Sequence, residues 1–212
     1  MNYKFFRQPR KLGYDANLRA ALNAATGEYL LILGNDDALA EPTTLRDAAL
    51  ALERFGRPEV AFGNVYESGK PPADAIRAHT TGILGKGPDV ALRMFRAFSC
   101  VTGVIFSRGA FRAHDTSRYD GSVYVQMYLA SRILAAGGRL LTLANPVAQV
   151  SVEVNGTPAN RFSDRLHDDD WHVRPATGGL DEVGRVVCDA ITPCVPESDR
   201  ARIVRAVYAQ LL

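Results

Sequence analysis

The pattern of apolar and polar positions divides the first third of the chain into alternating helices and strands. Apolar residues recur every three or four positions from Asn17 to Ala25, which predicts an amphipathic helix with Asp15 as its cap. The run Tyr29 to Leu33 has no polar alternation and lies between two glycines, as in a central strand covered on both faces. A helix from Thr43 or Thr44 to Phe55 and a buried strand at 60–62 follow.

The remaining elements are predicted from similar signals along the chain. We expect a strand at 3–6, a long surface loop at 68–88, a helix at 89–98 with Pro88 at its first position, a strand at 101–106, a short helix capped by Ser107, a helix at 124–136, strands at 140–143 and 147–154, an irregular loop at 155–179 and a helix at 198–212. Alternating strands and helices predict an α/β fold with a mostly parallel sheet flanked by helices.

Composition restricts the class of protein more than it indicates a function. The chain has 212 residues, 47% hydrophobic and 23% charged, which fits one globular domain and excludes a fibrous or disordered chain. A net charge of +2 is too small to indicate a nucleic-acid partner. The three cysteines show no CxxC spacing, so a reducing compartment is expected, without a zinc site or disulfide framework.

The chain shows no targeting or membrane-spanning signal. Its first ten residues carry charges and aromatic side chains where a signal peptide would have an apolar run. Its apolar stretches are far shorter than the roughly 20 residues that a spanning helix needs. We therefore expect a cytoplasmic protein. The arginines of the C-terminal helix support a second hypothesis, in which the protein lies peripherally on the inner membrane face.

The segment Asn35-Asp36-Asp37 carries the most informative chemistry. It follows a predicted buried strand, and ligands of open α/β sheets bind beyond the carboxyl ends of strands. One or both carboxylates could bind a hard cation such as Mg²⁺ or Mn²⁺, which completes its shell with water and substrate phosphates. The alternative is a plain turn, because Asn and Asp are common turn residues.

Several short motifs surround that segment. They are Gly13, Asn17, Ala25-x-Gly27-Glu28-Tyr29-Leu30, Asn35-Asp36-Asp37 and Pro42. Together they resemble the family 2 glycosyltransferases of GT-A fold, and within that family the abequosyltransferase-like enzymes. The resemblance extends over about Tyr3 to Val150. It implies a GT-A-like domain at 1–155 and a C-terminal loop and helical extension at 156–212 packed on the same domain.

The resemblance also implies a reaction and a set of site residues. A sugar would pass, with inversion, from a nucleotide-diphosphate donor to a glycan or lipid-linked acceptor in bacterial surface polysaccharide synthesis. Asp37, with Asp36, would bind the metal, and Gly13, Asn17, Asn35 and Asp36 would lie near the donor. The family usually has its base just before the helix that begins here near Tyr124, where Asp120 stands without the usual Glu-Asp pair. Asp120 is therefore the candidate base, and a cap or turn role is the alternative.

The chain departs from the family at its N-terminus. Two strands that bind the nucleobase and ribose in the family have no counterpart, so we expect an N-terminally truncated GT-A sheet. Such a sheet would expose an edge that a partner chain or a homo-oligomer could cover. The second hypothesis is therefore a non-catalytic or truncated module that binds a glycan or a partner chain.

Two further hypotheses, one about the enzyme class and one about a metal site, have less support. A metal-dependent nucleotidyltransferase has similar phosphate and metal needs, but the Gly-rich basic loop typical of that class is absent here. His167 and His172 flank three aspartates and Trp171, and one of them could complete a metal site. A solvated acidic loop explains the same segment.

Overall fold

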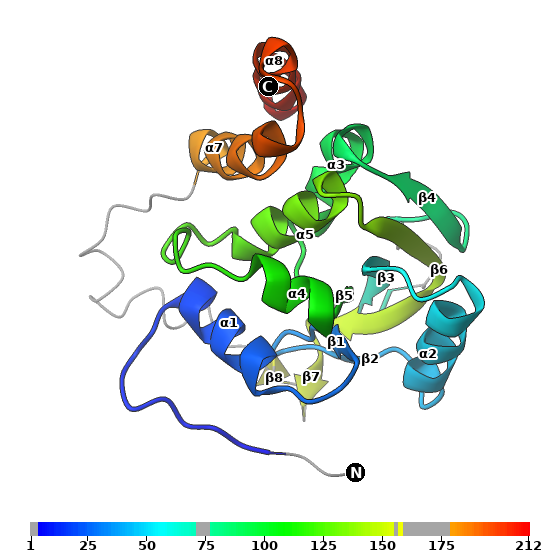
Figure 1. Cartoon of the computed structure of the whole chain (residues 1–212). Coiled ribbons are helices and arrows are strands. Elements are labelled where there is room, and N and C mark those ends of the chain that lie inside the picture. Colours follow the sequence, from blue (N-terminus) through cyan, green and yellow to red (C-terminus); the bar gives the residue numbers. More distant parts are fainter. Residues whose placement is uncertain (1–3, 71–76, 155–156, 159–178) are drawn as a thin grey trace.

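A mixed sheet of six strands forms the centre of the computed structural model, which describes residues 4–70, 77–154, 157–158 and 179–212 (Figure 1). The strand order is β1-β5-β3-β6-β2, and β4 also pairs with β6. The strands are β1 (Tyr29–Leu31), β2 (Ala38–Leu39), β3 (Val60–Glu67), β4 (Gly82–Lys86), β5 (Val104–Ser107) and β6 (Arg139–Val150). A separate two-stranded sheet joins β7 (Glu153–Val154) and β8 (Thr157–Pro158).

The predicted α/β class is confirmed, but the sheet is mixed and not mostly parallel. Strands β1 and β3 point the same way, as the strand–helix–strand pattern predicts, and β3 pairs in parallel with β6. Strand β5 lies between β1 and β3 and runs antiparallel to both. The short strands β2 and β4 also run antiparallel to β6. Only one of the described pairings is therefore parallel.

Strand β1 lies at an edge of the described sheet, which corrects the expectation of a central strand. Among the described strands it pairs with β5 alone. Leu30 is buried on one face, whereas Tyr29 and Leu31 are only half-buried. An unbroken apolar run does not distinguish a central strand from an edge strand that is covered by helices.

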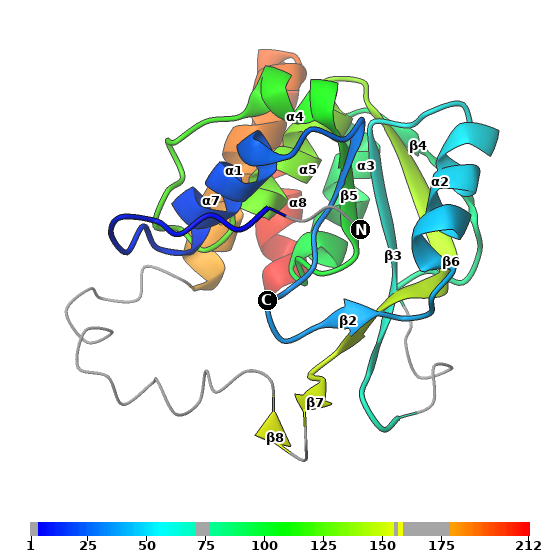
Figure 2. The same cartoon turned by 90° about the horizontal axis from the view of Figure 1, so that it is seen from below.

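Helices cover both faces of the sheet (Figure 2). The larger core contains Val60 and Phe62 of β3 and lies against helices on one face, whereas Ala61 between them faces a smaller core under α2. This alternation is the two-residue period of a strand. The helices are α1 (Tyr14–Ala24), α2 (Thr44–Arg54), α3 (Pro88–Met94), α4 (Arg108–His114), α5 (Val125–Ala135), α7 (Leu180–Ile191) and α8 (Glu197–Leu211), with 3₁₀ turns at Phe95–Phe98 and Thr192–Cys194.

The last two helices extend the larger core away from the sheet. Helix α7 packs against α5, and α8 packs against α7, so the C-terminal helices lie beyond α5 in Figure 1. Gly184 makes the approach of α7 to α8 possible, because a Cβ there would lie 2.6 Å from the ring of Tyr208. The predicted C-terminal helix is confirmed as α8, whereas α7 was not predicted.

Three other local predictions were wrong. Residues 4–6 form no strand, because they pair with no other described segment. The segment 82–86, expected within a loop, is strand β4, which pairs with β6. The two strands expected at 140–143 and 147–154 are mainly one strand, β6, since a register shift at Asn64 absorbs the irregular stretch around Pro146. Among the described helices, none is long and apolar enough to cross a bilayer.

Candidate functional site

The candidate metal-binding segment forms a tight turn at the end of β1. The backbone N–H of Asp37 donates to the carbonyl of Gly34 at 3.3 Å, which closes a β-turn around Asn35 and Asp36. Asn35 is exposed, and Asp36 and Asp37 are half-buried. The turn expected as the alternative is therefore present, and it presents the carboxylates at the edge of the sheet.

Two other segments hold the Asp37 carboxylate. The hydroxyl of Thr102, which is buried, accepts the Gly34 N–H at 3.0 Å and donates to Oδ2 of Asp37. The backbone N–H of Ser151, at the end of β6, donates to Oδ1 at 3.2 Å. A Cβ on Gly34 would lie 2.4 Å from Oδ2 of Asp37, so this close arrangement requires glycine.

A second group of candidate residues lies at the start of α1. Gly13 is the N-cap residue with φ of 79°, and the Asn17 N–H donates to its carbonyl at 3.2 Å. Both residues are exposed and so are available to a ligand. Burial, followed by the neighbouring charges of Asp15 and Cys100, raises the pKa of Tyr14.

Asp15 caps a different helix from the one in which it lies. Its carboxylate is 1% exposed and accepts the backbone N–H groups of Gly121, Val123 and Val125 at 2.8, 2.8 and 3.0 Å. Val125 begins α5, so Asp15 satisfies N–H groups that a helix start leaves without partners. The expectation that Asp15 caps its own helix was wrong, since Gly13 occupies that position.

The loop before α5 has a strained backbone that Asp15 holds in place. Val123 has φ of 70°, which is unusual for a β-branched residue and costs about 1–3 kcal/mol. Ser151, which contacts Asp37, has φ of 56°. Two of the three described non-glycine residues with positive φ therefore contact the candidate site or its supports.

Asp120, the candidate base, is paired with Arg19 of α1. Nη1 of Arg19 donates to both carboxylate oxygens of Asp120, at 3.0 and 2.8 Å, while its Nε donates to Asp115 at 2.6 Å. Burial lowers the pKa of Arg19, but its hydrogen bonds to the two carboxylates outweigh this effect and raise it. The Asp120 side chain is 29% exposed, so an acceptor hydroxyl could reach it.

The structure thus brings the predicted residues together in two groups. Asn35, Asp36 and Asp37 share one turn, while Gly13 and Asn17 share α1 with the arginine that holds Asp120. Within the described residues, no hydrogen bond or ion pair joins Asp37 to Asp120.

The residues of the turn fit a divalent cation with few protein ligands. Each oxygen of Asp37 accepts one hydrogen bond, and an ionised carboxylate has about four lone-pair positions, so both oxygens retain one. Among the described residues, no group of three or more His, Cys, Asp or Glu could hold a metal alone. Mg²⁺ and Mn²⁺ commonly bind through one or two carboxylates and substrate phosphates, and this donor set suits that arrangement. His167 and His172 lie outside the described residues.

The sequence comparison decides the family. The sequence model of glycosyl transferase family 2 matches residues 1–115, which is more than half of the chain. The chain belongs to glycosyl transferase family 2. The matched region contains Gly13, Asn17 and the Asn35–Asp37 turn, together with Thr102, whereas Asp120 lies beyond it. No curated protein matches the chain.

A solved structure of S. aureus TarS shares the fold of this family 2 chain. The crystal structure of TarS 1-349 in complex with UDP-GlcNAc matches with a TM-score of 0.57 and 17% identity, over 91% of this chain and 51% of that one. The chain thus spans about half the length of that structure. TarS 1-349 without a named ligand matches with a TM-score of 0.48 and 13% identity, over 94% of this chain and 68% of that one. A further TarS structure matches with a TM-score of 0.49 and 13% identity, over 94% of this chain and 42% of that one.

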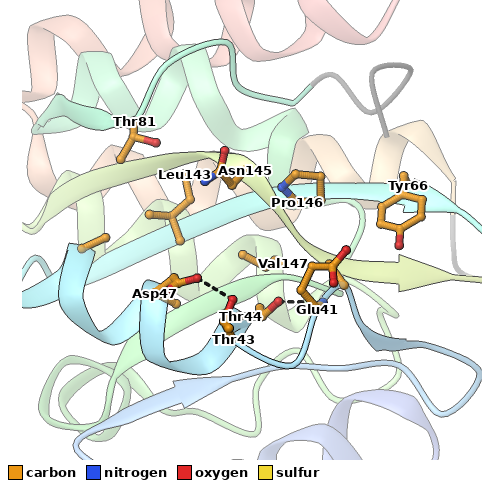
Figure 3. Close-up of a pocket in the computed structure, with 13 residues that line it drawn as sticks. Glu41, Thr43, Thr44, Asp47, Tyr66, Thr81, Leu143, Asn145, Pro146 and Val147 are labelled. Atoms are coloured by element: carbon orange, nitrogen blue, oxygen red, sulfur yellow. Dashed lines mark hydrogen bonds between the residues drawn. The ribbon is translucent and has the colours of Figure 1, made fainter. Parts of the chain in front are cut away.

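A cavity of about 320 Å³ lies between α2 and β6, and residues 34–37 of the aspartate turn do not line it (Figure 3). Its polar rim includes Glu41, Asp47 and Asn145, and its floor includes Leu143 and Val147. The lining has two acidic residues and no lysine or arginine, so it is poorly suited to a diphosphate. The cavity of this family 2 chain is therefore a separate feature from the candidate donor site.

Sequence reasoning missed the residues that support the candidate site of this family 2 chain. Thr102 lies in a segment that was predicted as a strand, without a role for its hydroxyl, and Asp15 was assigned to a local cap. Ser151 contributes its backbone N–H, which carries no signal in the side-chain sequence. An acidic residue near the start of a helix was the one available signal, and it pointed to the wrong helix.

Proposed function

We propose that this family 2 chain transfers a sugar from a nucleoside-diphosphate donor to a hydroxyl of a glycan or lipid-linked acceptor, with inversion, in bacterial surface polysaccharide synthesis. The observation that carries the proposal is the Asp37 carboxylate, which Thr102 and Ser151 hold at the end of β1 in a chain of this family. A carboxylate fixed on both oxygens is oriented before a ligand arrives, which favours binding at low entropic cost.

The turn supplies the donor end of the proposed reaction. Asp37, with Asp36 beside it, would hold a Mg²⁺ or Mn²⁺ ion, which when bound would neutralise charge on the leaving diphosphate. The exposed amide of Asn35 and the exposed start of α1 at Gly13 and Asn17 are then available to the donor. The start of α1 has free backbone N–H groups, which favour an anionic ligand.

Asp120 supplies the acceptor end. It would accept the proton of the acceptor hydroxyl while that oxygen bonds to the anomeric carbon and the carbon–diphosphate bond breaks. A single displacement of this kind inverts the configuration. Arg19 orients Asp120 and uses one lone pair on each of its oxygens, so each oxygen retains a position for the acceptor proton.

We also place the reaction on the cytoplasmic side of the inner membrane. The three cysteines Cys100, Cys188 and Cys194 are free, which suits a reducing compartment. A cytoplasmic position would give the chain access to nucleotide sugars and to lipid-linked acceptors at the membrane surface.

Calorimetric titration with UDP, GDP, CDP and TDP, each with and without Mn²⁺, tests the donor site. We expect one nucleotide to bind in a Mn²⁺-dependent manner and Asp37→Ala to remove that binding. Asp47→Ala is the matched control, because Asp47 is an exposed carboxylate at the cavity. It should bind like the unmodified chain, and loss of binding in both variants would contradict the assignment to the turn.

A glycan-binding module without catalysis is the second candidate function, and the cavity favours it. Tyr66, Thr81 and Asn145 at its rim, over an aliphatic floor, match the polar edges and apolar faces of a saccharide. This reading predicts no nucleotide binding by any of the four nucleotides. It also predicts saccharide binding in a glycan array that Tyr66→Ala removes.

A further inference from the structure

Arg77 is a half-buried arginine whose guanidinium lies among backbone carbonyls, without a carboxylate. Its guanidinium donates to the carbonyls of Thr102 at 2.7 Å and Cys100 at 3.1 Å, and also to that of Ala97. A longer hydrogen bond of 3.4 Å reaches the carbonyl of Gly63 in β3. All of these acceptors except Gly63 lie in the short segment 97–102 before β5.

The surroundings of Arg77 are costly for a cation. No ion pair joins Arg77 to an acid in the described part of the chain, and its buried Nε–H has no hydrogen-bond partner there. Burial lowers its pKa below the ordinary value for arginine. The guanidinium carbon lies 5.2 Å from the ring centroid of Phe62, which offsets part of the cost. A half-buried guanidinium with a buried Nε–H that has no partner, and with no ion pair, needs an explanation.

The backbone at Arg77 is itself fixed by a buried asparagine of β3. Oδ1 of Asn64 accepts the N–H groups of Arg77 and Ala78, both at 2.8 Å. Its Nδ2 donates to the carbonyls of Ala78 and Ala144 at 2.8 and 2.7 Å. The amide of Asn64 is therefore fully used, and it anchors the arginine to the centre of the sheet.

The segment that Arg77 binds is the one that orients Asp37. Thr102 accepts from Arg77 with its carbonyl and donates to Asp37 with its hydroxyl, so one residue connects the guanidinium with the carboxylate. The same hydroxyl accepts the N–H of Gly34 in the turn. Movement of the 97–102 segment would thus move the partner of Asp37.

We propose that Arg77 is a positioning residue for the candidate metal site, because it fixes Thr102 and, through it, the Asp37 carboxylate. This inference rests on the proposed function only for the identity of the ligand. A planar guanidinium with five N–H donors can bind several carbonyls at fixed angles, whereas a lysine ammonium cannot. Arginine rather than positive charge is therefore required at this position.

Replacement of the arginine by lysine tests the inference. Arg77→Lys keeps the charge and should weaken Mn²⁺ binding in the presence of the nucleotide by about 10- to 100-fold, the usual effect of losing an outer-shell partner. Thr102→Val should weaken Mn²⁺ binding by a similar factor, whereas Thr102→Ser, which keeps the hydroxyl, should bind Mn²⁺ like the unmodified chain. Arg54→Lys is the control, because Arg54 also lies over a ring, that of Phe55 at 5.6 Å, but on the surface.

Amide hydrogen exchange provides a readout that needs no ligand. In Arg77→Lys the amides of Gly34, Gly103 and Val104 should exchange at least about tenfold faster, while α5 keeps its protection. Unchanged exchange, or unchanged Mn²⁺ affinity in a folded Arg77→Lys protein, would overturn the inference. Absence of nucleotide binding in the unmodified chain would instead count against the proposed function, and the exchange rates would still decide the role of Arg77.

Discussion

The carboxylate of Asp15 accepts the backbone N–H of Val125, which lies 110 positions further along the chain. The same carboxylate binds two N–H groups in the loop that carries Asp120. One buried side chain therefore joins α1, which carries candidate donor residues, to the loop of the candidate base. Arg19, one helical turn further along α1, contacts the same loop from the outside.

Asp15→Ala should lower the free energy of unfolding by about 3 kcal/mol, because it leaves three N–H groups without their charged acceptor. Urea denaturation measures this loss. Asp89→Ala is the control, since Asp89 lies in the first turn of α3 with a side chain that is 81% exposed. Its effect should stay within about 0.5 kcal/mol. Equal losses in the two variants would contradict the role of Asp15.

Gly34→Ala should impair ligand binding more than folding. The new Cβ would lie 2.4 Å from Oδ2 of Asp37, and the flexible carboxylate can move aside at a cost of about 1 kcal/mol or less. The displaced carboxylate would then lose its bond to Thr102. Calorimetry should show Mn²⁺-dependent nucleotide binding reduced by about tenfold or more.

Gly109→Ala is the matched control for that measurement, because a Cβ at Gly109 would meet no atom within 4 Å. It should bind like the unmodified chain. Normal binding by Gly34→Ala would show that the orientation of Asp37 is unimportant.

Asp120 and Asp115 share Arg19, which makes them a matched pair for testing the base. Asp120→Asn should slow release of the nucleoside diphosphate from the bound nucleotide sugar by at least about 100-fold, the usual contribution of a general base. Donor affinity should not change. Asp115→Asn removes the other partner of Arg19 and should stay within a few-fold of the unmodified rate. Equal losses would assign the effect to the ion pair and not to base catalysis.

Stability should fall on mild acidification through His114. Burial, followed by the charge of Arg132, lowers the pKa of His114 below its ordinary value of 6.5. As the pH falls through 6.5, the unfolded chain takes up a proton before the folded chain does, so folding becomes less favourable. The loss levels off once the folded state is also protonated.

Urea midpoints between about pH 7.5 and about pH 5.5 measure this effect, and His114→Gln should flatten that part of the profile. An identical profile in the variant would assign the acid sensitivity to other groups.

Local signals predicted the elements well where the chain supplies its own partners. Ser107 was expected to cap a helix, and its hydroxyl accepts the Ala110 N–H at 3.2 Å. Pro88 was expected in the first turn of a helix and stands there. Both signals act within about one turn of helix, so a short stretch of sequence is enough to predict them.

Long-range contacts limited the prediction of the sheet and of the site. The position of β5 between β1 and β3 depends on pairing that the strand pattern does not encode, and this converts a parallel sheet into a mixed one. Asp15 shows the same limit, because an acid at a helix start gives no sign of which helix it will cap. The aspartate turn was predicted, but its partners Thr102 and Ser151 lie 65 and 114 residues away from Asp37.

Those separations give the Asp37 site a particular place in the folding of the chain. Each hydrogen bond of the Asp37 carboxylate closes a long loop, and such contacts form late because the entropy of the loop is lost before the contact is gained. A folding intermediate with helices and single hairpins in place would still lack the oriented carboxylate. The proposed metal affinity would therefore appear only in chains whose sheet is complete, and addition of metal and nucleotide would protect those chains selectively from proteolysis.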